Sequence, residues 1–202
     1  MSISTSVITP EVISNAMNYS QYRELIDQLL SENKTTGENH SEGMLDFTLL
    51  NLQRMKRWDK TAKVSEEAAN LVKSINRKQI WLVITEGWCG DAAQIVPYFE
   101  KLAANTDKIE VRYILRDRHL AVMDQYLTNG GRSIPKLIAL DAGDLEEQFE
   151  WGPRPRELQE MMSEYKKDPK GVSPEEFKKK IHLWYAKNKN KALEEELIAL
   201  IS

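Results

Sequence analysis

A short, wholly apolar run at residues 80–84 leads almost at once into Trp88-Cys89-Gly90, and this pair of features constrains the fold more than anything else in the chain. An apolar run of this length is typical of a strand that is buried on both faces. A Cys that opens the next helix lies near unpaired N–H groups and the positive end of the helix dipole, which stabilise a thiolate and lower its pKa. The sequence therefore predicts a strand, a sharp turn and a helix that expose the thiol of Cys89.

Composition limits the classes of protein to which the chain can belong. The 202 residues are 41% apolar and 29% charged, with a formal net charge of −3, which is ordinary for a soluble globular protein. Since the basic residues do not form one block, we expect neither nucleic acid nor a membrane as a partner. No apolar run approaches the ~20 residues of a membrane-spanning helix. The N-terminal residues do not resemble a signal peptide, so we expect a cytoplasmic protein, and a single Cys excludes a disulfide framework.

The sequence contains no motif for a metal or a cofactor. His40, His119 and His182 lie far apart, and none has a metal-ligand spacing with Cys89. We interpret them as surface or half-buried side chains. The chain also lacks a Gly-rich phosphate loop and a Gly-x-Ser-x-Gly turn. We therefore expect neither a metal nor a cofactor.

The two ends of the chain are predicted to be helical. Residues 1–78 contain three stripes of apolar side chains at helical spacing, the first running from Tyr22 to Leu30, and form an N-terminal helical extension. Residues 168–202 form a C-terminal helical segment, in which Pro174 marks a helix start. The pattern leaves open whether this last segment is one helix or two.

The middle segment, residues 79–167, has a different pattern. Its elements are expected in the order β-α-β-α-β-β-α, and strands that alternate with helices before a final hairpin predict a mixed α/β sheet with helices on its faces. The second helix of this unit is expected at residues 120–127, stopped by Asn129-Gly130-Gly131.

Four local features of the middle segment resemble the thioredoxin superfamily. They are Trp88-Cys89-Gly90 after the first strand, Pro97 inside the following helix, Ile134-Pro135 before the third strand and Gly152 after the last strand. The resemblance implies a thioredoxin-like fold for residues 79–167, a cis peptide bond before Pro135, and a groove beside Cys89 that holds an extended peptide. Over longer stretches the chain is similar to a group of bacterial thioredoxin-like proteins.

The resemblance implies a site built around Cys89 as the catalytic residue. The residues expected to contact a substrate or partner are Trp88, Gly90, Asp91, Ser133, Ile134, Pro135, Gly152 and Arg154. Two interpretations of Arg154 stay open: its charge lowers the pKa of the nearby thiol, or it is a solvated side chain between two prolines.

The chain departs from the family at the residues that resolve a disulfide. Ala92 stands where thioredoxins have their second Cys, Val83 where they bury an Asp, and Asp91 where they have a Pro. No intramolecular disulfide can form at this turn. A carboxylate near Cys89 disfavours the thiolate, although an acidic residue in the first turn of a helix is favourable.

These features leave several functions open. The first is monothiol thiol-disulfide exchange, in which Cys89 attacks a disulfide and an external protein or small thiol releases it. The alternative is a redox-silent module that binds a peptide or protein on the thioredoxin scaffold. Oxidative sensing by a sulfenic acid and a merely buried Cys are two weaker possibilities. The N-terminal helices could cover Cys89 or pack on the far face of the sheet.

Overall fold

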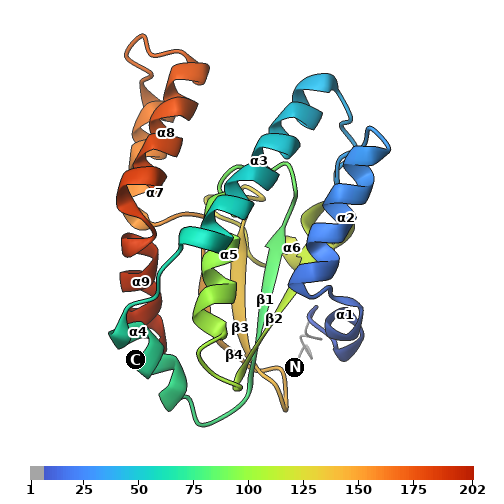
Figure 1. Ribbon diagram of the computed structural model, residues 1–202, viewed down its shortest axis with the longest axis vertical. Helices are drawn as coiled ribbons and strands as arrows, with labels where there is room; N and C mark the ends of the chain where they lie inside the picture. Colours follow the sequence, from blue (N-terminus) through green and yellow to red (C-terminus); the bar gives the residue numbers. More distant parts are fainter. Residues whose placement is uncertain (1–6) are drawn as a thin grey trace.

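A computed structural model of the protein describes residues 7–202 and has a four-stranded mixed sheet at its centre (Figure 1). In order across the sheet, the strands are β2 (Ile109–Leu115), β1 (Gln79–Thr85), β3 (Lys136–Asp141) and β4 (Glu147–Trp151). β1 is parallel to β2 and antiparallel to β3, and β4 returns antiparallel to β3. The predicted mixed α/β sheet is confirmed.

Two helices of the first half of the chain lie against the helix that follows β1. This helix, α5 (Ala92–Ala103), has Pro97 in its interior and is buried along most of its length. α3 (Glu42–Thr61) packs along it, and α4 (Glu66–Ser74) packs near its far end. Because α5 is enclosed between the sheet and α3, the residues at its start lie between several elements.

The N-terminal helices close the β2 edge of the sheet. α1 (Pro10–Asn15) and α2 (Tyr19–Ser31) lie on the side of β2, opposite the C-terminal helices drawn in orange and red (Figure 1). Met17 pairs with Tyr113 of β2 in an isolated antiparallel bridge, and the ring of Tyr22 stacks on that of Tyr113 at 5.3 Å. These contacts cover the backbone groups of an edge strand that could otherwise pair with another chain.

The C-terminal segment contains two helices after the helix that closes the core unit. They are α8 (Pro174–Asn188) and α9 (Lys191–Ile201), and they follow α7 (Arg156–Lys167). Lys189 and Asn190 both have positive φ, 53° and 64°, which ends one helix and reverses the chain into the next. α9 packs against α4 and β4, so this segment lies beside the opposite edge of the sheet from α2.

The helix expected at residues 120–127 is much shorter in the structure. α6 (Leu120–Met123) is a single turn that follows the 3₁₀ turn η1 (Arg116–Arg118). After Met123 the backbone continues with i→i+3 hydrogen bonds, from Gln125 to Val122 and from Tyr126 to Met123, so the helical bonding ends there. The reversal itself lies at the expected stop, where Thr128 and Gly131 form a bridge around Asn129 and Gly130. The prediction was right about the element and wrong about its length.

One hydrophobic core joins the predicted extensions to the sheet. Buried side chains of α2, α3, α4, α8 and α9 belong to the same cluster as those of the strands. The division at residues 78 and 168 stays a prediction. Within residues 7–202, no helix combines the length and the apolar character needed to cross a bilayer.

Candidate functional site

β1 carries the chain into the turn that holds Cys89. Residues 80–85 of this strand are buried, since they lie between two neighbouring strands and under the helices. The N–H of Cys89 donates to the carbonyl oxygen of Glu86 at 3.0 Å, which closes the turn. α5 then begins at Ala92. The predicted succession of strand, turn and helix is confirmed.

The thiol of Cys89 is buried, with 7% of the residue exposed. It donates to the carbonyl oxygen of Ile134 at 3.4 Å and accepts from the N–H of Ala92 at 3.5 Å. Burial, reinforced by the negative charge of Asp91, raises the pKa of Cys89 to about 12. The N–H of Ala92 and the charge of Arg154 act in the opposite direction without overcoming burial. The expectation of an exposed, activated thiol is wrong for this structure, in which the thiol is covered and protonated at neutral pH.

A buried ion pair lies beside the thiol. Nη2 of Arg154 is 2.5 Å from Oδ2 of Asp91, and the two side chains are only 15% and 12% exposed. The hydroxyl of Tyr185, on α8, donates to Oδ1 of the same carboxylate at 2.9 Å. Arg154 is therefore near the thiol, as the resemblance implies, and it is not a solvated side chain. Because its charge is paired with Asp91, it gives the thiolate little net stabilisation.

α8 also covers the glycine that follows Cys89. A Cβ on Gly90 would lie 3.1 Å from Cε1 of His182. Nδ1 of His182 is 3.1 Å from Nε2 of Gln94, whose Oε1 accepts from the indole N–H of Trp58 at 2.5 Å. Since the indole fixes which end of the amide is the acceptor, Nδ1 of His182 accepts and its proton lies on Nε2. Burial and the nearby charge of Arg54 lower the pKa of His182 to about 4, so the ring is neutral at pH 7.

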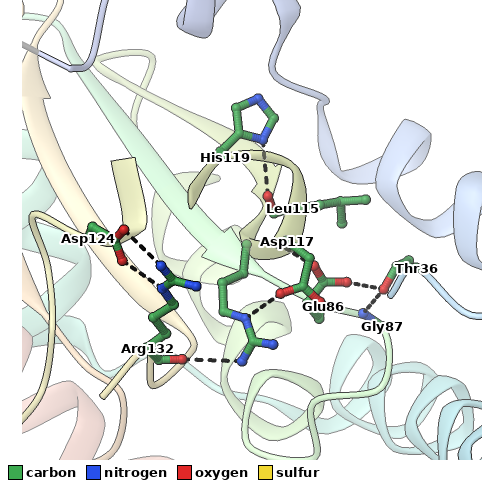
Figure 2. A network of polar contacts seen from close by, with 9 residues as sticks. Thr36, Glu86, Gly87, Leu115, Asp117, His119, Asp124 and Arg132 are labelled. Carbon is green, nitrogen blue, oxygen red and sulfur yellow. Dashed lines mark hydrogen bonds and ion pairs between the residues drawn. The ribbon is translucent and has the colours of Figure 1, made fainter. Parts of the chain in front are cut away.

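A second buried carboxyl group, that of Glu86, lies where the turn begins, and Figure 2 shows its polar contacts. Glu86 is completely buried; it accepts from the hydroxyl of Thr36 and, at 3.0 Å, from the N–H of Asp117. The Thr36 hydroxyl in turn accepts from the N–H of Gly87 at 3.0 Å. Burial raises the pKa of Glu86. The loop before α3 is therefore tied by side-chain hydrogen bonds to the residues that precede Cys89.

A pocket of about 380 Å³ opens beside this network, next to Trp88. The guanidinium of Arg116 lies 4.7 Å from the ring centre of Trp88. Both of the arginines in the pocket are paired, Arg116 with Asp117 and Arg132 with Asp124. The pocket is lined by Gly37, Glu38, Asn39, Met44, Trp88, Arg116, Asp117, Leu120 and Arg132. It is thus a polar cavity of mixed charge with one aromatic wall.

The segment before β3 approaches β4 very closely. The peptide bond between Ile134 and Pro135 is cis. Gly152 has a φ of 124°, and a Cβ at this position would lie 2.3 Å from the carbonyl oxygen of Pro135. Only a glycine meets both conditions. This contact holds Ile134, whose carbonyl group faces the thiol, against the end of β4.

Most of the predicted site residues are linked by these contacts. Cys89 meets Ile134, Asp91 meets Arg154, and Pro135 meets Gly152. Gly90 lies under α8, Trp88 faces the pocket described above, and Ser133 is half-buried in the loop that contains Ile134.

Sequence reasoning missed the side chains that cover this turn. Tyr185 and His182 come from a helix about ninety residues away, and no local signal points from them to Cys89. Glu86 could have been found, because it is a carboxylate directly after a buried apolar strand. The sequence offered two positions for the N-terminal helices, over Cys89 or on the far face of the sheet, and neither describes the structure fully. α3 packs along α5, and the loop at Thr36 reaches the turn. The glycine of the turn, Gly90, is covered by α8 of the C-terminal segment.

Comparisons with solved structures recover this architecture over nearly the whole chain. A protein of unknown function from Pseudomonas aeruginosa, known from a crystal structure at 1.5 Å, is 14% identical with a TM-score of 0.61, and the match covers 95% of each chain. An HIV epitope scaffold is also 14% identical, with a TM-score of 0.53 over 92% of this chain and 98% of the other. At these identities the likeness concerns the fold alone. No curated protein matches the chain.

A comparison with family models identifies the chain's relatives directly. The model described as Thioredoxin matches residues 37–166, which is more than half of the chain. The match begins at the loop that is tied to Glu86, so it includes α3 and α4 as well as the sheet. The chain therefore belongs to this thioredoxin family and has a thioredoxin-like domain.

Proposed function

We propose that the protein is a redox-silent binding module on a thioredoxin scaffold, which holds an extended segment of a partner protein beside Trp88 and the residues before β3. This is the alternative that the sequence left open. The geometry of the turn supports it better than monothiol exchange, because the thiol is buried and its pKa is raised.

The single observation that carries the proposal is the state of the Cys89 thiol. Thiol-disulfide exchange requires an accessible thiolate. Burial raises the pKa of Cys89 to about 12, so the thiol stays protonated at pH 7, whereas a few per cent of a free cysteine is ionised there. The thiol is also only 7% exposed, beneath a helix whose Tyr185 is bound to Asp91. The thiol is therefore neither accessible nor ionised.

The pocket beside Trp88 supports the binding half of the proposal. An aromatic wall with paired charges around it is suited to a partner segment that carries both apolar and polar side chains. Its arginines are held in place by Asp117 and Asp124, so little side-chain entropy is lost when a partner binds.

We expect peptides to bind the protein without using the thiol. Extended peptides selected from a displayed library should bind the wild type and Cys89→Ser with affinities equal within about twofold, since the Ser variant changes only one buried atom. Trp88→Ala should weaken binding by at least about tenfold, because it removes the aromatic wall. Fluorescence anisotropy with labelled peptides measures all three. If the selected peptides bind Cys89→Ser more weakly than the wild type, the thiol takes part in binding and thiol chemistry is favoured. If no peptide of the library binds the wild type, the proposal of a binding module is wrong.

A second function, monothiol exchange, is favoured by the groups that surround the sulfur atom of Cys89. The N–H of Ala92 points at Sγ, and Arg154 lies close enough to lower the pKa of the thiol, so a thiolate would find partners if the turn were uncovered. This function requires a rearrangement that exposes the thiol, which is 7% exposed in this structure.

The rate of Cys89 alkylation by iodoacetamide separates the two functions. For the folded protein we expect slow alkylation that is still rising above pH 10, since the pKa of the thiol is raised to about 12. The protein unfolded in urea should react with a midpoint near the ~8.5 of a free cysteine. Cys89→Ser supplies the blank, as Cys89 is the only cysteine. Fast alkylation of the folded protein with a midpoint below that of the unfolded chain would sink the redox-silent proposal.

A further inference from the structure

A second pocket lies at the meeting point of four helix ends and shares no lining residue with the Trp88 pocket. It has a volume of about 590 Å³ and lies where the end of α3 and the start of α4 meet the corner between α8 and α9. The contact between α4 and α9 is visible in Figure 1. The lining residues are Arg57, Trp58, Thr61, Lys63, Val64, Ser65, Ala186, Lys189, Asn190, Lys191 and Glu194.

The charges around this pocket are mostly positive. Four of its lining residues are cations, Arg57, Lys63, Lys189 and Lys191, and the only carboxylate among them is Glu194. That carboxylate is already engaged, since it accepts from the N–H of Ser65 and the hydroxyl of Tyr98. Among the ion pairs of residues 7–202, none involves the three lysines. The rim therefore favours an anion.

Asn190 gives this pocket a polar group that lacks a partner. The residue is only 3% exposed, and within the described chain neither Nδ2 nor Oδ1 of its amide has a hydrogen-bond partner. Buried polar side chains are nearly always paired, so this amide points to a partner from outside the chain, which it reaches when the Asn190 side chain turns toward the cavity. Its φ of 64° places it at the tight corner before α9, where the helix begins.

The remaining walls suit the apolar body of a ligand. Trp58 is buried beneath Arg57, whose guanidinium lies 4.8 Å from the centre of the indole ring. Val64 and Ala186 add aliphatic surface. A pocket with apolar walls, one amide and a ring of cations has the composition of a site for a small organic molecule.

We propose that this pocket binds a small organic anion, with a phosphate or carboxylate group among Arg57 and the lysines and a polar group paired with the amide of Asn190. The site is separate from Cys89 and from the Trp88 pocket, and it does not depend on the function proposed above. Carboxylates and phosphates are recognised by the same cations, so the ligand class is defined by charge, size and an amide-binding group.

The test is a titration of the full-length, ¹⁵N-labelled protein with phenyl phosphate, benzoate and inorganic phosphate. We expect at least one of the two aromatic anions to shift the side-chain amide signals of Asn190, and which of them binds more tightly identifies the anionic group. Inorganic phosphate lacks the aromatic ring and benzyl alcohol lacks the charge, so each should bind more weakly than the tighter of the two aromatic anions. Absence of shifts with both aromatic anions, or equal binding of inorganic phosphate, would overturn the proposal.

Matched variants test the two parts of the site. Asn190→Gly keeps the backbone conformation and removes the amide, and Lys189→Gln with Lys191→Gln removes two charges. Each should raise the dissociation constant at least about tenfold. Lys187→Gln, an exposed lysine of α8 outside the pocket, should change it less than twofold. Circular dichroism establishes that each variant is folded, and unchanged affinity in folded Asn190→Gly would show that the amide has no role.

Discussion

Replacing Gly152 with alanine is expected to lower the free energy of unfolding by at least about 4 kcal/mol, because two costs add at this position. The backbone has a φ of 124°, which residues with a Cβ rarely adopt. The new Cβ would also lie 2.3 Å from the carbonyl oxygen of Pro135, a backbone atom that cannot move aside without shifting the start of β3. Urea denaturation followed by circular dichroism measures the loss.

Substitutions at two other glycines separate the conformational cost of Gly152→Ala from its steric cost. Gly130 has a φ of 75°, but a Cβ added there would meet no atom within 4 Å, so Gly130→Ala should show the conformational cost alone, about 1 kcal/mol. Gly43, in α3, has open space and ordinary φ, so Gly43→Ala should be neutral or stabilising by up to about 1 kcal/mol. A loss in Gly152→Ala no larger than that in Gly130→Ala would contradict the close approach of β4 to Pro135.

Replacing Arg154 with alanine is expected to cost about 3–5 kcal/mol, the range for breaking a buried ion pair from one side. The Asp91 side chain is only 12% exposed, and after the loss of the guanidinium it would keep its hydrogen bond from the hydroxyl of Tyr185 but lose the cation it is paired with. A carboxylate that loses its counter-charge in such a place is strongly destabilised. Equilibrium urea denaturation at pH 7 measures the difference from the wild type.

Arg156→Ala is the matched control for this prediction. Arg156 begins α7 and is exposed, and its backbone N–H, which the substitution keeps, donates to Glu196. The substitution should therefore change stability by less than about 0.5 kcal/mol. Combining Arg154→Met with Asp91→Asn should cost less than the sum of the two single changes, since the charges are removed together. Additive losses would mean that the two side chains do not act as a pair.

The fold followed from local patterns because each pattern reports a local physical requirement. The apolar run of β1 has to be buried on both faces, and Gly152 satisfies a backbone condition that few other residues meet. The length of α6 did not follow, because the apolar side chains at residues 126 and 127 continue the helical spacing after the backbone has left the helix at Met123.

The candidate site could be predicted only in part. The sequence left open whether Arg154 lies near Cys89 or in solvent, and it could not show that Asp91 takes the guanidinium's charge. The apolar stripe of α8 predicts that Tyr185 is buried without indicating what buries it. An amphipathic pattern specifies a face of a helix and not the surface that this face meets.

By itself, the sequence determined the thioredoxin-like sheet, the turn that holds Cys89, and the absence of a second Cys at Ala92, since these depend on neighbouring residues and on backbone conformation. Only the tertiary structure decided that the thiol is covered. Its protonation depends on burial and on the charge of Asp91, and Tyr185 of α8 reaches Asp91 from a position 94 residues further along the chain. Desolvation of a thiol is a property of everything packed around it, so no stretch of sequence near Cys89 could have revealed it.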